Sequence, residues 1–191
     1  LFTGHLEQTS IAYASAKYAG VQMCKSINEQ DGFVTFIPVI PNTAYGPNDN
    51  FDLNSSHVLS ALIRRIHEAK EQNSPKVLLW GTGSPKREFV FVDDIVDACI
   101  LLLTSRLRND ILPINIGVGS DISIKSLAEK ISRMVGYSGK IKWDKSKPDG
   151  TPRKLLDNNR IKSIGWKVTT DFDEGLECTY QWYLKNISQF Q

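Results

Sequence analysis

The sequence predicts an α/β fold, because helical and strand patterns alternate along most of its 191 residues. In several segments, apolar residues recur at three- and four-residue spacing, as they do on the buried face of a helix. Short runs rich in β-branched and aromatic residues lie between these segments and are bounded by turn residues, which is typical of strands. No internal repeat indicates a solenoid or a propeller.

Each expected element has a local signal. Asp93, Ser123 and either Ser55 or Ser56 are expected to cap the helices that follow them. Pro38 lies inside an expected strand and indicates a bulge or an early end there. The expected helices cover residues 12–29, 58–70, 95–103, 125–135, 157–164 and 171–184, and the expected strands cover 33–40, 76–80, 87–92, 113–118 and 140–143.

The overall charge and hydropathy exclude some classes of protein. The net charge is only +2, so we expect neither a nucleic-acid-binding surface nor a membrane-binding surface over the whole molecule. The longest apolar runs, such as residues 100–103, are far too short to span a bilayer. No signal peptide is visible. Together these features predict a cytoplasmic protein with no membrane partner.

The cysteines and histidines do not suggest a metal site. The three cysteines, Cys24, Cys99 and Cys178, are widely spaced and form no C-x-x-C pair. Each falls in a helical apolar pattern, so we expect reduced thiols in the core of a cytosolic protein. The three histidines form no ligand pair with them, so no metal is expected.

Tyr13 and Lys17 are the first candidates for catalysis. They lie four residues apart in a small-residue run, and this spacing places them on one face of a helix. A nearby ammonium group favours the phenolate form, which makes a tyrosine a better proton donor and acceptor near neutral pH. The alternative is a helix with one half-exposed tyrosine and one solvated lysine, and the spacing alone does not separate the two readings.

Five further stretches each fit either a functional role or a purely structural one. Residues 41–50 follow a strand, where ligands bind in open α/β sheets, but they also fit a surface loop. His57 falls in the first turn of a helix, whose dipole favours a neutral imidazole, yet it fits a structural role as well. Arg64 and Arg65 are either solvated or reach a phosphate. Gly-Thr-Gly at 81–83 is weak as a phosphate loop, and the basic stretch 145–154 fits anion binding or solvation.

Taken together, the motifs resemble the carboxyl-terminal part of an extended short-chain dehydrogenase/reductase of the NAD-dependent epimerase/dehydratase family. More narrowly, the chain resembles the GDP-L-fucose synthase family, which acts on GDP-4-keto-6-deoxy-mannose as a 3,5-epimerase and 4-reductase. The resemblance covers essentially the whole chain. The Tyr-x-x-x-Lys and Tyr-Gly-Pro motifs are shared widely. The narrower motifs, which decide the assignment, are Asn-Asp-Asn-Phe at 48–51, Ser-His-Val at 56–58 and Lys-Pro-Asp-Gly-Thr at 147–151, and the resemblance also includes Arg-Glu-Phe at 87–89.

The resemblance implies a role for each candidate residue. Tyr13 and Lys17 would form the proton relay, Lys17 would also bind the nicotinamide ribose of NADP(H), and His57 would be the acid/base of epimerisation and lie beside the cofactor. The remaining residues would bind the cofactor (Pro41, Asn42, Thr43 and Ala44) or the GDP-sugar (Arg65, Trp80, Arg87 and Asp149). The resemblance also implies a Rossmann-like remainder at residues 1–50, a mainly substrate-binding lobe at 51–191 with segments returning to the sheet, and a homodimer.

Two departures from the family pattern affect these expectations. The family's glycine-rich cofactor loop, catalytic Ser/Thr and epimerisation cysteine lie upstream of the tyrosine and are absent from this sequence, so the chain by itself is expected to be inactive. Family members commonly carry Asn two residues before the tyrosine of Tyr-Gly-Pro, where this chain has Thr43 and places the Asn at position 42. Two alternatives therefore remain. The protein is another nucleotide-sugar epimerase or dehydratase, or it is a non-catalytic fragment that binds a sugar nucleotide.

Overall fold

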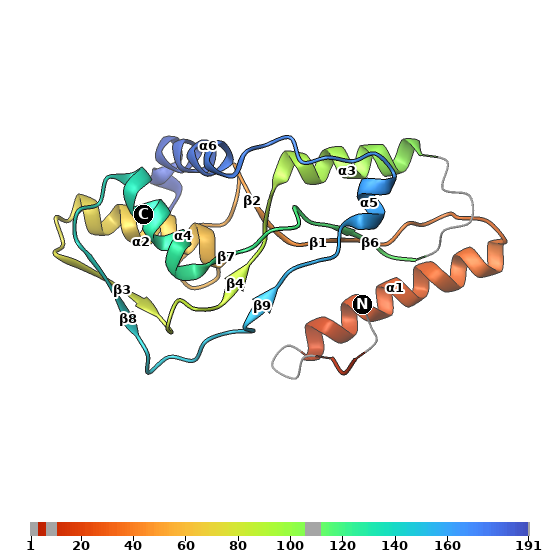
Figure 1. Ribbon diagram of the computed structural model, residues 1–191, viewed down its shortest axis with the longest axis horizontal. Helices are drawn as coiled ribbons and strands as arrows, with labels where there is room; N and C mark the ends of the chain where they lie inside the picture. Colours follow the sequence, from red (N-terminus) through yellow and green to blue (C-terminus); the bar gives the residue numbers. More distant parts are fainter. Residues whose placement is uncertain (1–3, 7–10, 106–111, 191) are drawn as a thin grey trace.

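The computed structural model describes residues 4–6, 11–105 and 112–190, and it confirms the α/β class. Helices and strands alternate along the chain, as Figure 1 shows. The helices are α1 (Ile11–Asp31), α2 (Val58–Glu71), α3 (Val92–Thr104), α4 (Ile124–Val135), α5 (Asn159–Ser163), α6 (Phe172–Lys185) and the 3₁₀ turn η2 (Ile187–Gln189). The strands are β1 (Val39–Pro41), β2 (Thr43–Tyr45), β3 (Lys76–Trp80), β4 (Lys86–Arg87), β5 (Phe89–Phe91), β6 (Ile114–Ile116), β7 (Ile122–Ser123), β8 (Lys140–Asp144) and β9 (Arg153–Lys154).

The strands pair across long stretches of sequence, and most of the pairs are parallel. β1 pairs with β6, β2 with β5, and β3 with β8, each in parallel. β4 lies between β7, to which it is antiparallel, and β9, to which it is parallel. Parallel neighbours need a crossover connection, and here helices lie between the paired strands in the sequence.

Two apolar clusters form the core. The larger one packs α2, α4 and α6 with β3 and β5, and includes Phe51, Ile63, Ile131 and Tyr183. The smaller one joins α3, α5, β5 and β6, and includes Val90, Ile114, Ile116 and Trp166. β5 therefore connects the two clusters, because Phe89 and Phe91 belong to the larger one and Val90 to the smaller one.

Several local predictions are confirmed. Ser123 caps α4 by accepting a hydrogen bond from the Ser126 N–H, and Gly136 ends that helix at φ 75°, in the left-handed region. Asp171 caps α6 by accepting from the N–H groups of Asp173 and Glu174. β3 matches the expected strand at 76–80, and β8 extends the expected strand at 140–143 by one residue.

Other expected elements are shorter or divided. The strand expected at 33–40 is present only as Val39–Pro41, because the ladder with β6 begins at the Pro38 carbonyl, which accepts from the Ile114 N–H. The strand expected at 87–92 is divided at Glu88 and ends where Val92 enters α3. Loop 41–50 contains β2, the strand expected at 113–118 is Ile114–Ile116, and the helix expected at 157–164 is Asn159–Ser163.

Two cap predictions and one burial prediction are wrong. The N-cap of α2 is His57 rather than Ser55 or Ser56, and the N-cap of α3 is Phe91 rather than Asp93. Asp93 and Asp94 instead lie in the first turn of α3, where a negative charge also interacts favourably with the helix dipole. The cysteines all lie in helices and are free, but only Cys24 and Cys99 are partly buried, whereas Cys178 is exposed.

α1 is largely exposed, although its sequence has an apolar pattern. Among its residues only Asn28 is buried, and Tyr13 and Met23 are 68% and 65% exposed. Asn28 holds the chain reversal after the helix: its Oδ1 accepts from the N–H groups of Thr35 and Phe36, and its Nδ2 donates to the Phe36 carbonyl. In the described part of the chain, no helix is long and apolar enough to cross a membrane.

His67 gives the fold a testable pH dependence. It is buried between α2 and α6, with its Nδ1 3.1 Å from the Tyr180 hydroxyl and its ring against Tyr183. Burial lowers its pKa below 6.5; Lys70 acts in the same direction, and Glu71 and Glu68 oppose it. Above the pKa of the unfolded chain the imidazole is neutral in both states. As the pH falls below that value, the unfolded state gains a proton first, so the folded state loses stability.

We therefore expect the free energy of unfolding to fall below about pH 6.5, with a contribution from His67 of at most about 1.4 kcal/mol per pH unit. His67→Gln, which still offers an acceptor to Tyr180, should remove this contribution. Urea unfolding of both proteins between about pH 5 and 7.5 checks it. Parallel curves for wild type and variant over that range would contradict the assignment.

Candidate active site

The structure brings Tyr13 and Lys17 together on α1. The Lys17 ammonium lies 5.5 Å from the centre of the Tyr13 ring, as expected for residues one helical turn apart. Both side chains are exposed, so an oxygen of a bound molecule can reach the phenol and the ammonium from the same side. This geometry permits proton transfer to a substrate oxygen, with the lysine as an electrostatic partner.

The segment 41–44 is held firmly at the end of β1 and the start of β2. The Asn42 N–H donates to the Ile116 carbonyl, and its side-chain oxygen accepts from the Thr43 N–H. The Asn42 Nδ2 donates to the buried carboxylate of Glu88. Pro41 and Ala44 are exposed, so this segment presents small apolar surfaces while the amide of Asn42 is already bonded.

His57 is exposed and begins α2 as its N-cap residue, in an extended conformation. Its imidazole makes no capping hydrogen bond, so it does not have the structural role that an N-cap side chain usually has. The position suits an imidazole that exchanges protons with a bound molecule.

The structure distinguishes between the two arginines of α2. Arg64 is committed to the fold: its Nε donates to Glu68 at 2.7 Å, and its Nη1 donates to the Phe51 carbonyl at 3.1 Å. Arg65 instead lies over the Trp80 ring, with its guanidinium carbon 5.9 Å from the ring centre. Arg65 is therefore the better placed of the two to meet a ligand.

Trp80 ends β3 and is 66% exposed, which is unusual for such a large apolar side chain. Besides Arg65, the Lys147 ammonium lies 5.7 Å from its ring centre. Sequence reasoning placed Lys147 in a basic stretch and at the start of the Lys-Pro-Asp-Gly-Thr motif, but nothing local predicts its contact with β3. An exposed aromatic ring with two cations can stack on a base and attract phosphate.

Asp149 is close to this group, but its carboxylate is already bonded. Its two oxygens accept from the N–H and the hydroxyl of Thr82, at 2.9 and 2.7 Å. The Thr82 hydroxyl, and then its N–H, hold the pKa of Asp149 below its usual range. Gly81, at φ 78°, must be glycine here, because a Cβ would lie 2.3 Å from the carboxylate. Asp149 thus joins loop 81–83 to loop 145–150 beside Trp80.

Arg87, in β4, is half-buried and near loop 145–150. Its Nη1 donates to the carbonyls of Lys86 and Thr151, and its Nη2 faces Gly150. Burial lowers the pKa of Arg87 from its ordinary value, which still leaves it a cation at neutral pH. The remaining N–H groups of a guanidinium anchored on one side are suited to a diphosphate.

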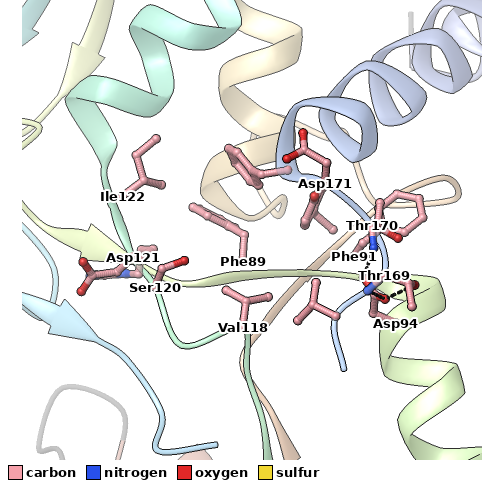
Figure 2. A pocket seen from close by; sticks show the side chains of 14 residues that line it. Phe89, Phe91, Asp94, Val118, Ser120, Asp121, Ile122, Thr169, Thr170 and Asp171 are labelled. Carbon is pink, nitrogen blue, oxygen red and sulfur yellow. Dashed lines mark hydrogen bonds between the residues drawn. The ribbon is translucent and has the colours of Figure 1, made fainter. Parts of the chain in front are cut away.

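Arg87 also lines a cavity of about 570 Å³. Figure 2 shows Phe89 between two walls of this cavity, one with Ser120 and Asp121 and the other with Thr169 and Asp171. Arg87 is the only candidate from the sequence among the residues that line it. The acidic residues around it have fold roles: Asp94 accepts from Thr169 and Thr170, and Asp171 caps α6.

The predicted residues thus fall into separate places among the residues that the structure describes. Arg65, Trp80, Arg87 and Asp149 gather around β3, β4 and loop 145–150, whereas Tyr13 and Lys17 lie on α1. Figure 1 shows α1 well apart from β3 and β8, and no contact is recorded between the Tyr13–Lys17 pair and His57. Glu88 is a residue that sequence reasoning missed as a candidate; its signal was a charged residue inside an otherwise apolar strand pattern.

Comparison with known proteins identifies the family. The profile of the NAD dependent epimerase/dehydratase family matches residues 2–117, more than half of the chain. The chain belongs to the NAD-dependent epimerase/dehydratase family. The α/β fold with parallel strand pairs agrees with this membership, and so does the Tyr13–Lys17 pair within the matched region.

Individual family members are similar over nearly the whole chain. Probable GDP-L-fucose synthase 1 of Oryza sativa subsp. japonica is 50% identical over 187 residues, covering 98% of this chain and 56% of the rice protein. A GDP-6-OMe-4-keto-L-xylo-heptose reductase of C. jejuni is 32% identical with a TM-score of 0.89, covering 97% of this chain and 64% of that one. A GDP-L-fucose synthetase of Naegleria fowleri, solved with NADP bound, is 29% identical with a TM-score of 0.85, covering 98% and 60%. The chain therefore spans little more than half the length of the relatives it matches.

Proposed function

We propose that the complete gene product containing this chain is an NADPH-dependent epimerase and reductase that converts GDP-4-keto-6-deoxy-mannose to GDP-L-fucose. One observation carries this proposal: identity of 50% with a probable GDP-L-fucose synthase is maintained over 187 residues. The geometry supports a nucleoside diphosphate as the bound group, because Trp80 offers a ring between two cations and the half-buried Arg87 lies nearby.

The residues of this chain suit the nicotinamide half of the cofactor. The exposed ammonium of Lys17 can donate to ribose hydroxyls, and the exposed Pro41 and Ala44 can pack against a flat ring. The glycine fingerprint that holds a cofactor diphosphate does not occur in the 191 residues, so we expect this chain alone to bind NADPH weakly. When bound, NADPH supplies the hydride.

In the proposed reaction, the protein moves protons. His57 exchanges protons at the carbons beside the ketone, C3 and C5, and Tyr13 protonates the C4 oxygen as the hydride arrives. Lys17 stabilises the charge that remains on Tyr13. Arg65, Trp80 and Arg87 hold the GDP group, while Asp149 acts through the loop that it fastens next to Trp80.

The test is an assay of the purified complete gene product with GDP-4-keto-6-deoxy-mannose and NADPH. We expect oxidation of NADPH, followed by its absorbance, in the usual range of about 1–10³ turnovers per second, with GDP-L-fucose as the product. A protein that binds GDP-sugar but does not oxidise NADPH would contradict the proposal and favour a non-catalytic binding protein.

A second candidate is reduction at C4 without epimerisation. It is favoured by the fold similarity to the C. jejuni reductase and by the amide of Asn42, which is bonded to Glu88 rather than facing outward. Running the assay in D₂O separates the two candidates. Deuterium at C3 and C5 of the product supports the first, whereas its absence together with NADPH oxidation supports the second.

Three further features belong to the same proposal. Residues 1–50 contribute to a dinucleotide-binding domain, and 51–191 form mainly a substrate lobe; the pairing of β1 with β6 and β2 with β5 supports the return of later strands to that domain. The protein is cytoplasmic, a proposal supported by its free cysteines, which suit a reducing compartment. It is a homodimer, a proposal supported by the exposed surface of α1, which is available for an interface. Light scattering of the complete gene product measures its oligomeric state.

A further inference from the structure

Glu88 is a fully buried acid for which the proposed mechanism has no use so far. It is 0% exposed and lies between Arg87 at the end of β4 and Phe89 at the start of β5. Acidic side chains are almost never fully buried unless their oxygens have partners, because burying an unpaired carboxylate is costly. The partners of Glu88 therefore indicate what the residue does.

The carboxylate of Glu88 joins three separate segments of the chain. Oε1 accepts from the Gly119 N–H at 2.6 Å, in the connection between β6 and β7. Oε2 accepts from the Leu156 N–H at 3.0 Å, just after β9. Oε2 also accepts from the Asn42 Nδ2, in the segment proposed to face the nicotinamide. Segments 46, 31 and 68 residues away in the sequence thus meet at one side chain.

The surrounding backbone is shaped around this carboxylate. A Cβ on Gly117 would lie 2.7 and 2.8 Å from the two oxygens of Glu88, closer than real contacts allow. Only glycine leaves room there, so the backbone just after β6 and the carboxylate are fitted to each other. The side chain therefore has little freedom to turn away from Asn42.

Both side-chain oxygens of Glu88 act as hydrogen-bond acceptors. All three recorded partners are N–H groups, and an ionised carboxylate is the side chain of this shape that only accepts. No ion pair is recorded for Glu88 within the described part of the chain. The partners of the carboxylate are neutral N–H donors. Its hydrogen bonds therefore fix the positions of those donors and do not neutralise a cation.

We propose that Glu88 is a positioning residue for the cofactor and substrate, an inference that rests on the proposed function. Through Asn42 it fixes segment 41–44, which is to lie against the nicotinamide. Through the adjacent peptide it fixes the strand position of Arg87, which is to bind the diphosphate. One buried carboxylate thereby sets the distance between the cofactor side and the substrate side of the site.

Glu88→Gln, Asn42→Asp and the double variant test this role in the complete gene product. Glu88→Gln brings an N–H donor against the donors of Asn42 or Gly119, and Asn42→Asp brings a second carboxylate against Glu88, so each single change breaks the contact. The double variant reverses the polarity and restores one bond between positions 42 and 88. The assays are run well below the unfolding temperature of each variant. In each single variant kcat should fall about 10- to 100-fold, and the dissociation constant for NADPH should rise. The double variant should recover part of both losses.

Ile131→Ala is the matched control. Ile131 is fully buried in α4, away from the site, so this variant should unfold at a lower temperature while its kcat and NADPH affinity stay at wild-type values. If Glu88→Gln behaves like this control, or if the effects of the two single changes simply add in the double variant, the positioning role is wrong.

Failure of the proposed function gives a different result. A wild-type protein that does not oxidise NADPH with the GDP-keto-sugar contradicts the function, whatever the variants do. In that case NADPH titrations of the wild type, the two single variants and the double variant still decide on Glu88. Equal affinities would overturn the role, and a weaker single variant that the double variant restores would support it.

Discussion

Tyr13→Phe in the complete gene product is expected to lower kcat for the C4 reduction by about 10²- to 10⁴-fold, the usual contribution of a positioned proton donor. The variant removes only the hydroxyl and keeps the aromatic ring, so the change in packing is small. The dissociation constant for the GDP-sugar should therefore stay within about twofold of wild type, because the loss is confined to the transition state. Stopped-flow NADPH oxidation and a substrate titration measure the two quantities.

Tyr18→Phe is the matched control, because it makes the same change on the same exposed helix but five residues further on, where the helical repeat points the side chain in another direction. We expect it to retain wild-type turnover. Turnover of Tyr13→Phe equal to that of the control would remove Tyr13 from the mechanism and leave the plain reading of an exposed helix.

His57→Gln is expected to abolish epimerisation selectively. Its imidazole is exposed at the start of α2 and makes no capping bond, so the change should not alter the free energy of unfolding appreciably. Deuterium incorporation at C3 and C5 from D₂O should fall by about 10²-fold or more, because glutamine cannot take up a proton. Nuclear magnetic resonance of the sugar after incubation without NADPH measures this exchange separately from reduction.

Lys70→Gln, in the last turn of α2, is the control for a general effect on that helix, and it should leave the exchange rate unchanged. Exchange at the wild-type rate in His57→Gln would show that another group moves these protons. It would remove His57 from the mechanism but leave the first candidate function standing, because exchange at C3 and C5 would still occur.

The sequence was sufficient where the decisive interactions are local. The contact between Tyr13 and Lys17 follows from the four-residue repeat of a helix, and the caps at Ser123 and Asp171 follow from hydrogen bonds to residues two or three positions away. The motif resemblance also led to the family that the profile comparison shows. Local capping preferences did not predict that His57 is the N-cap of α2. Serine is the better capping residue, but the helix begins at Val58, after both Ser55 and Ser56.

The rest was decided by partners far away in the sequence. The lengths of β1 and of the divided β4–β5 segment depend on where the partner strands lie, and local propensity does not contain that information. Only the fold shows that Asp149 is bonded to Thr82, that Lys147 joins Arg65 at Trp80, and that Asn42 is fixed by Glu88. The sequence by itself determined the α/β class, the family and the candidate residues, because helical spacing and motifs are short-range patterns. The tertiary structure decided which of these side chains are open to a ligand and which are already bonded, because burial and hydrogen bonding arise only when distant segments meet.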